Sequence, residues 1–235
     1  MQRQIVLDTE TTGLSPSDGH RIIEIGCIEL MNRQRTRQDF HVYINPKREI
    51  DAGALAVHGI TAKFLSDKPV FSEIMDGLLD YLRDAELIIH NAAFDVGFLE
   101  YEFQLAGCKS KSLADYCTVL DTLTYARKKH AGQRNSLDAL CKRYRVDNTN
   151  RKLHGALLDA ELLAEVYLAM TGGQTSLLIE ADFDQANRDV QRELSSITSI
   201  EESDLPELIV TQPSAEEYAA HRNFLKILNP TLNSA

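Results

Sequence analysis

Two carboxylates stand close together near the start of the chain. Asp8 and Glu10 lie at the end of an apolar run over residues 4–8 that has the character of a buried strand. Side chains two residues apart on a strand share a face, so both carboxylates point the same way. Two acids held together repel each other unless a cation joins them, and a hard divalent cation is the natural guest. A chance acidic pair in a turn-rich segment is the plain alternative.

Two further acids and a histidine stand in contexts typical of functional sites. Asp95 comes four residues after Asn91, where a predicted strand passes into a helix, and sites of α/β proteins collect at the C-terminal ends of strands. Asp159 sits among leucines on a predicted helix, where a carboxylate is paired or metal-bound. His154 precedes Asp159 by five residues. Taken singly, these residues have structural alternatives: a carboxylate favoured by a helix N-terminus, or a structural histidine.

Together, four acids and a histidine indicate a two-metal site for phosphoryl transfer. Two Mg²⁺ or Mn²⁺ ions about 3.5–4 Å apart would hold the attacking and leaving oxygens of an in-line displacement. Their charge would offset the carboxylates and allow a polyanionic substrate to approach. A neutral His154 would accept a proton from the attacking water. The chain has no Walker loop, GxGxxG or GxSxG sequence, which leaves nucleotide-cradling and serine-hydrolase functions without support.

The overall composition is that of a globular protein. Of the 235 residues, 43% are hydrophobic and 26% charged, which excludes wholesale disorder. No apolar run approaches the roughly 18 residues that span a bilayer. The N-terminus does not resemble a signal peptide. The four cysteines form no CxxC pair and are expected to be reduced thiols, so we expect a cytoplasmic protein.

The charge is unevenly distributed along the chain. The net charge is −10, but residues 177–235 hold 11 acidic and 4 basic residues, so most of the acidity belongs to the C-terminal part. Residues 127–152 hold nine basic and two acidic residues. This basic stretch is either a solvated helix face or a footprint for a phosphate backbone, and only nearby chemistry favours the second.

The pattern of apolar residues predicts an α/β fold whose mixed sheet is flanked by helices. Strands are expected at 4–8, 22–31, 39–45, 86–90 and near 117–120, and helices at 70–83, 93–105, 121–130, 136–145 and 155–170. The first three strands are separated by few residues, so antiparallel pairing is their natural connection. The C-terminal ends of strands would then carry the acids.

A break in composition after residue 173 divides the chain into three predicted parts. They are an α/β domain over 1–176, a flexible acidic linker over 177–212 and a helical tail over 213–235. The tail begins with a capping-box pattern, and its helix is expected to stop before Pro230. A single helix of this length is marginal alone in water, so its apolar stripe is expected to need a partner surface.

Three segments of the chain resemble the exonuclease motifs of the DEDDh 3′→5′ exonucleases. They are Asp8-Thr-Glu10-Thr-Thr-Gly13, Asn91-Ala-Ala-Phe-Asp95 and His154-Gly-Ala-Leu-Leu-Asp159-Ala. The histidine five residues before the last Asp, with Gly155 and not Tyr after it, is typical of the h branch. Further segments, among them Val57-His58-Gly59-Ile60, are similar to the proofreading (epsilon) subunits of bacterial DNA polymerase III. The resemblance covers nearly all of residues 3–176 and returns near 208–228.

The resemblance implies a fold, a chemistry and a set of site residues. The fold is RNase H-like, with a five-stranded mixed sheet. Asp8, Glu10, Asp159 and Asp95 would hold two Mg²⁺ or Mn²⁺ ions, and His154 would be the general base. Asp8, Glu10, Gly53, His58 and Asp159 would bind substrate. Gly53 stands where the family has an acid that contacts the nucleotide, so that contact is lost or replaced, with Asp51 as the candidate.

The same resemblance implies partners and leaves two other functions open. The expected activity is proofreading: release of nucleoside 5′-monophosphates from a single-stranded or frayed DNA 3′ end. The tail would bind the catalytic (alpha) subunit of DNA polymerase III, and Gln174-Thr-Ser-Leu177-Leu178 resembles a motif that docks on the sliding clamp. The alternatives are an RNA-trimming exonuclease of the same family and a catalytically idle polymerase-binding subunit. The tail argues against the first and the intact acids and histidine against the second.

Overall fold

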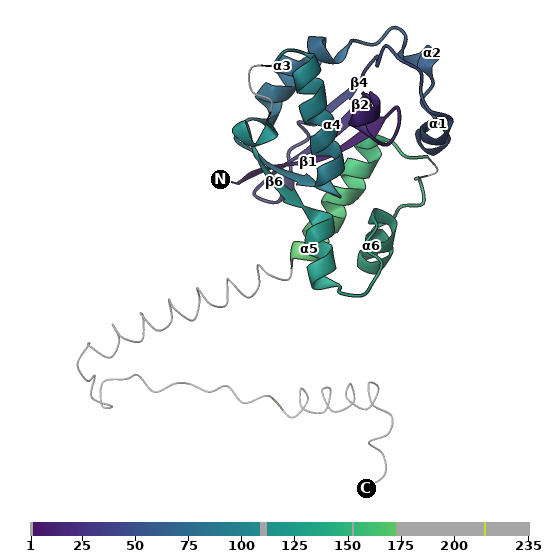
Figure 1. The fold of residues 1–235 in the computed structure, drawn as a ribbon. Coiled ribbons are helices and arrows are strands. Elements are labelled where there is room, and N and C mark those ends of the chain that lie inside the picture. The colour runs from purple at the N-terminus through teal and green to yellow at the C-terminus, as the bar shows by residue number, and fades with distance from the viewer. Residues whose placement is uncertain (1, 109–111, 152, 173–213, 215–235) are drawn as a thin grey trace, which may run out of the picture. The chain divides into compact units, whose positions relative to one another are not determined.

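The apolar run near the start of the chain forms the centre of a mixed sheet (Figure 1). In this computed structural model the sheet order is β3-β2-β1-β5-β6, and β4 pairs with β2 beside this path. The strands are β1 (Arg3–Thr11), β2 (Ile22–Met31), β3 (Gln34–Arg35), β4 (Phe40–Tyr43), β5 (Glu86–Ile89) and β6 (Thr118–Asp121). β2 pairs antiparallel with both β1 and β4, whereas β5 pairs parallel with both β1 and β6. Both the mixed sheet and the antiparallel pairing of the early strands are therefore confirmed.

The structure describes residues 2–108, 112–151, 153–172 and Ser214. The helices in these ranges are α1 (Ala52–His58), α2 (Ala62–Leu65), α3 (Phe71–Leu82), α4 (Ala92–Leu105), α5 (Thr122–Lys129), α6 (Leu137–Tyr144) and a helix over 156–172, with short 3₁₀ turns η1 (Pro16–Asp18) and η2 (Leu113–Asp115). The predicted linker, the tail helix and the segment Gln174–Leu178 lie outside the described residues, apart from Ser214. These three expectations therefore stay predictions.

Two apolar cores cover the two faces of the sheet. Ile5 and Leu7 of β1 are buried in one core with α3 and α4. Val6, between them, is buried in the other core with α6 and helix 156–172. Alternate strand residues point to opposite faces, so a strand covered on both sides must be apolar at every position. This is why the run before Asp8 is continuously apolar.

Short elements account for the differences from the predicted fold. The sheet has six strands and not five because β3, with two residues, is too short to show an alternating pattern. The short helices α1 and α2 were not predicted. In α1, Leu55 and Val57 are exposed, so its sequence has no clear apolar side. The longer helices and strands lie within a few residues of their predicted bounds.

Two expectations from composition can be compared with the described residues. All four cysteines are free thiols, as predicted. Within the described ranges, no helix is both long and apolar enough to span a bilayer.

Candidate active site

A cavity of about 690 Å³ opens beside the C-terminal ends of β1 and β5. The parallel pairing of Leu7 with Ile89 places these two strand ends together, so residues that follow β5 meet residues that end β1. The five residues predicted for the metal and proton-transfer roles all line this cavity: Asp8, Glu10, Asp95, His154 and Asp159. The tertiary structure thus brings together acids from three separate segments.

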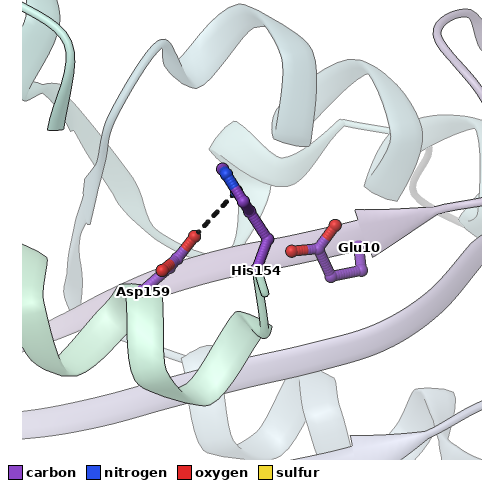
Figure 2. Close-up of side chains that lie close together, drawn as sticks. All are labelled: Glu10, His154 and Asp159. Atoms are coloured by element: carbon purple, nitrogen blue, oxygen red, sulfur yellow. Dashed lines mark ion pairs between the residues drawn. The ribbon is translucent and has the colours of Figure 1, made fainter. Parts of the chain in front are cut away.

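Asp8 and Glu10 lie on the side of β1 that helix 156–172 covers. Val6, two residues before Asp8, is buried in the core that contains this helix, and alternate strand residues share a face. One ligand atom each from Glu10, His154 and Asp159 lie within 4.8 Å of one another (Figure 2). Asp8 lines the same cavity outside this group of three. Oxygen and nitrogen donors in this number and spacing fit a divalent metal ion.

Two residues of β2 determine where helix 156–172 begins. Gly26 pairs with Asp8, and a Cβ atom at Gly26 would lie 2.2 Å from the backbone nitrogen of Leu157. The helix can therefore approach the sheet only because residue 26 has no side chain. The buried carboxylate of Glu24 accepts a hydrogen bond of 3.1 Å from the N–H of Ala156, at the positive end of the helix dipole. Because the helix begins at this point, Asp159 lies close to Glu10.

Asp95 reaches the cavity from α4, which packs on the other face of the sheet. Asn91, between β5 and α4, has a left-handed backbone with φ of 66°, which asparagine adopts more readily than most residues. This sharp turn starts α4 directly after the strand and places Asp95 in its first turn. Asp95 is 3% exposed and accepts a hydrogen bond of 2.7 Å from the Thr9 hydroxyl.

Burial and mutual repulsion make this cluster of acids hard to ionise. Burial raises the pKa of Glu10 to about 8, and the charges of Asp159 and Glu24 add to the effect. The pKa of Asp8 is raised by burial and by the charges of Asp95, Asp159 and Glu10. Burial raises the pKa of Asp95 to about 7, although the hydrogen bond from Thr9 opposes the shift. A bound divalent cation would favour the charged forms of all these groups.

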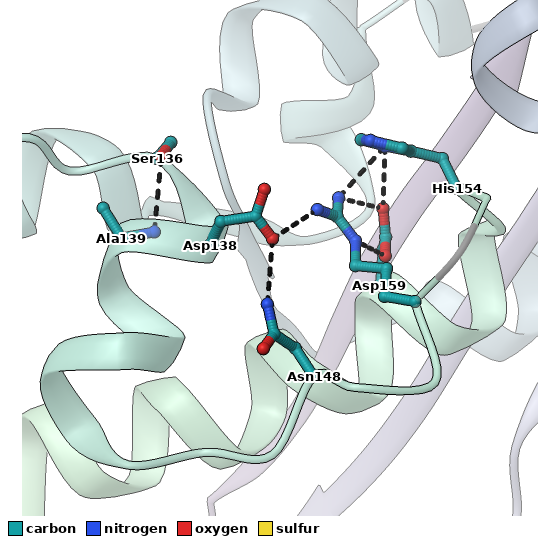
Figure 3. A network of polar contacts seen from close by, with 7 residues as sticks. Ser136, Asp138, Ala139, Asn148, His154 and Asp159 are labelled. Atoms are coloured by element: carbon teal, nitrogen blue, oxygen red, sulfur yellow. Dashed lines mark hydrogen bonds and ion pairs between the residues drawn. The ribbon is translucent and has the colours of Figure 1, made fainter.

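The Arg151 side chain supplies positive charge to this cluster. Its Nε and one terminal nitrogen donate to the two carboxylate oxygens of Asp159 at 2.6 and 2.7 Å. The same terminal nitrogen lies 3.0 Å from Nδ1 of His154, and the other donates to Asp138 at 2.7 Å. Asp138, His154 and Asp159 form one polar network (Figure 3). A guanidinium can only donate, so Nδ1 of His154 is the acceptor and a neutral ring carries its proton on Nε2.

The predicted substrate residues Gly53 and His58 line a second cavity of about 460 Å³, which shares Glu10 with the first. His58 accepts a hydrogen bond of 2.9 Å from the N–H of Ile60 through Nδ1. Its Nε2 is buried without a hydrogen-bond partner among the described residues, and burial lowers the pKa of the ring. An added Cβ at Gly53 would have no neighbour within 4 Å, so this side of the cavity is open.

Among the residues that shape the site, Arg151, Glu24 and Thr9 were not singled out from the sequence. Arg151 was counted only as one of nine basic residues, and Glu24 and Thr9 were given no role. Each acts through a contact with a residue of another structural element: Arg151 with Asp138 and Asp159, Glu24 with Ala156, and Thr9 with Asp95. Spacing along one strand or helix contains no signal for such contacts. The position of Thr9 between two candidate ligands was the one available hint.

Comparison with known proteins gives consistent matches over most of the chain. The exonuclease family (RNase_T) matches residues 5–167. The chain is 51% identical to the DNA polymerase III subunit epsilon of Pasteurella multocida, over 97% of this chain and 89% of that protein. It is 50% identical to the DNA polymerase III subunit epsilon of Escherichia coli K12, over 96% of this chain and 93% of that protein. These alignments include the C-terminal part beyond the exonuclease match.

A solved structure with a similar fold is exonuclease X in complex with 5′-overhanging duplex DNA. The match has a TM-score of 0.57 and 25% sequence identity, and covers 72% of this chain and 92% of that chain.

Proposed function

The chain belongs to the exonuclease family and acts as the proofreading exonuclease of DNA polymerase III, and we propose that it hydrolyses the terminal phosphodiester at a DNA 3′ end with two Mg²⁺ or Mn²⁺ ions. The observation that supports this most is the convergence of Asp8, Glu10, Asp95, Asp159 and His154 on one cavity. The product would be a nucleoside 5′-monophosphate.

The four carboxylates are the proposed metal ligands. Asp8 and Glu10 reach the cavity from β1, Asp95 from α4 and Asp159 from helix 156–172. Bound divalent ions would lower the pKa of the attacking water and balance charge on the phosphate. The protein keeps the ligands rigid: Thr9 orients Asp95, and the contact of Glu24 with Ala156 positions the helix of Asp159.

His154 is the proposed general base. Its side chain is 45% exposed and lies beside the proposed metal ligands, so its ring can reach a water molecule bound next to them. A neutral imidazole accepts a proton and passes it to solvent, a contribution that is typically worth 10²–10⁴ in rate.

The second cavity is the proposed binding site for the terminal nucleotide. The ring of His58 lines this cavity and can pack against a nucleotide held there. Gly53 leaves room beside it, and Asp51 lines the same cavity. We expect the nucleotide to be held by His58 and by the open space at Gly53, with Asp51 as the nearby acid.

Activity on matched oligonucleotides tests the metal site and the substrate class together. Asp8→Ala and Asp159→Ala should each remove nearly all release of nucleotides from single-stranded DNA, while circular dichroism shows an intact fold. EDTA should abolish the activity of the unaltered chain, and Mg²⁺ or Mn²⁺ should restore it. Faster cleavage of RNA than of DNA would favour the RNA-trimming alternative, and absence of all nuclease activity would favour an idle polymerase-binding subunit.

The C-terminal part is the proposed tether to the polymerase catalytic subunit. The support is the match to subunits of DNA polymerase III, which extends over 97% of the chain, together with the apolar stripe predicted for 213–235. Deletion of residues 180–235 should leave activity on single strands unchanged and abolish co-purification with the catalytic subunit. Binding retained by the shortened chain would place the interface on the exonuclease domain. The same polymerase context supports a cytoplasmic location.

A contact with the sliding clamp through Gln174–Leu178 is also proposed, because this segment resembles a short motif that docks on the clamp. Replacing Gln174, Leu177 and Leu178 with Ala should weaken clamp binding in surface plasmon resonance and leave cleavage of a short oligonucleotide intact. No measurable clamp affinity in the unaltered chain would end this proposal.

A further inference from the structure

The Arg151 guanidinium is hydrogen-bonded to the carboxylate of Asp159, which is a proposed metal ligand. Its two contacts with Asp159, of 2.6 and 2.7 Å, take one lone pair on each carboxylate oxygen. Asp159 is 3% and Arg151 8% exposed at the side chain, so water does not weaken this pair much. Bidentate pairs of this kind are among the strongest charge-assisted hydrogen bonds in proteins.

The same guanidinium also takes up the lone pair of His154. The hydrogen bond of 3.0 Å to Nδ1 leaves a neutral ring with its other nitrogen protonated. Nδ1 lies only 3.3 Å from Asp159, so it faces the ligand group and not bulk solvent. While Arg151 stays in this position, the nitrogen of His154 nearest the ligands cannot accept a proton.

Arg151 is the built-in counter-charge of the acidic cluster. Its three nitrogens contact Asp159, His154 and Asp138, so its positive charge lies within the group of acidic side chains. Among the described residues that line the first cavity, the arginines are Arg127 and Arg151, and there is no lysine. Of these two, Arg151 makes the contacts with Asp159. The side chain therefore offsets part of the charge that divalent ions would offset on binding.

A second anchor gives Arg151 a place to remain after it leaves Asp159. Asp138 accepts from its third nitrogen at 2.7 Å and also accepts from the side-chain amide of Asn148 at 3.1 Å. Asp138 stands in the first turn of α6, which Ser136 caps (Figure 3), so its position does not depend on Asp159. Rotation about the Arg151 side chain can thus break the contacts with Asp159 and keep the contact with Asp138.

We propose that Arg151 is a competitor of the divalent metal ion for Asp159: it holds Asp159 and His154 when no metal is bound, and metal binding displaces it onto Asp138. This inference rests on the proposed function, because it takes Asp159 as a metal ligand. Displacement releases Nδ1 of His154 at the same time, so the metal site and the base become competent together.

Metal affinity measured by calorimetry tests the competition without reference to activity. Arg151→Gln should bind Mn²⁺ about tenfold more tightly than the unaltered chain, about 1.4 kcal/mol in binding free energy. The metal-free variant should also melt at a lower temperature and gain more from Mn²⁺, because Asp159 is left buried without its partner. The matched control is Arg127→Gln, which removes a charge from the same cavity but no bond to Asp159, and should change the affinity less than twofold.

The outcomes separate the inference from the function on which it rests. Equal or weaker Mn²⁺ binding by Arg151→Gln, with normal binding by the unaltered chain, would overturn the competition and leave the metal site intact. Absence of Mn²⁺ binding by the unaltered chain would overturn both. A tenfold gain in the Arg127→Gln control would reduce the effect to general electrostatics and likewise overturn the competition.

A measurement on the unaltered chain covers the case in which Arg151→Gln does not fold. In NMR spectra the Nε–H of Arg151, bonded to Asp159, should exchange slowly with water in EDTA, and its signal should weaken as Mg²⁺ is added. The conservative variant Arg151→Lys, which cannot make the bidentate pair, identifies the signal by its loss. A signal that stays protected at saturating Mg²⁺ would overturn the displacement.

Discussion

Replacing Glu10 with Gln is expected to stabilise the metal-free protein at neutral pH, although Glu10 is a proposed ligand. The pKa of Glu10 is raised from its usual 4.5 to about 8, chiefly by burial. At a pH between these two pKa values, the Glu10 carboxyl has lost its proton in the unfolded chain and still holds it in the folded chain. The free energy of unfolding therefore falls as the pH rises. The full stability is present below pH 4.5 and is lost progressively towards pH 8.

The size of the effect follows from this interval. At pH 7 the unfolded carboxyl has passed its usual pKa by two and a half pH units, each worth about 1.4 kcal/mol, which gives roughly 3 kcal/mol. Glutamine has nearly the same shape and cannot ionise in either state. Glu10→Gln should therefore unfold with a free energy roughly 3 kcal/mol higher at pH 7, and less than about 1 kcal/mol higher at pH 5.

Urea denaturation in EDTA, followed by circular dichroism at both pH values, measures this difference. Glu102→Gln is the matched control, because Glu102 is also buried but is paired with Arg21 through hydrogen bonds of 2.6 and 2.7 Å. Its loss should destabilise the protein at both pH values, by roughly 3 kcal/mol. If Glu10→Gln were no more stable than the parent at pH 7, the acids would not be under the repulsion and burial described above.

Three further changes test other parts of the site. His154→Ala should lower kcat about 10²–10⁴-fold with Mn²⁺ affinity nearly unchanged, and a parallel loss of affinity in calorimetry would make it a ligand instead. Gly26→Ala should destabilise the fold by at least 1–3 kcal/mol in urea, because its methyl group would lie 2.2 Å from helix backbone, whereas Gly77→Ala on an open side of α3 should stabilise by about 0.5–1 kcal/mol. Thr9→Val removes the hydrogen bond to Asp95 and should raise the pKa of that carboxyl further in an NMR titration; an unchanged midpoint would show that Thr9 does not favour its charged form.

Several properties of the site were determined by local sequence and could be predicted from it. The continuous apolar run of β1 requires a strand buried on both faces, and the two-residue period of a strand then places Asp8 and Glu10 on one side. Helical spacing located the helix of Asp159, and the change from strand to helix near Asn91 located Asp95. These predictions depend on the regular spacing of side chains within one strand or helix, which can be read from neighbouring residues in the sequence.

The meeting of these segments was decided by the tertiary structure. Asp159 lies near Glu10 because Gly26 admits the helix backbone and Glu24 holds its first N–H, and both residues belong to a different strand from Glu10. Arg151 is a further example: the sequence shows it only as one of nine basic residues over 127–152, whereas its partners come from α6 and helix 156–172. A side chain's partner depends on how separate elements pack together, and no periodicity within one element contains that information.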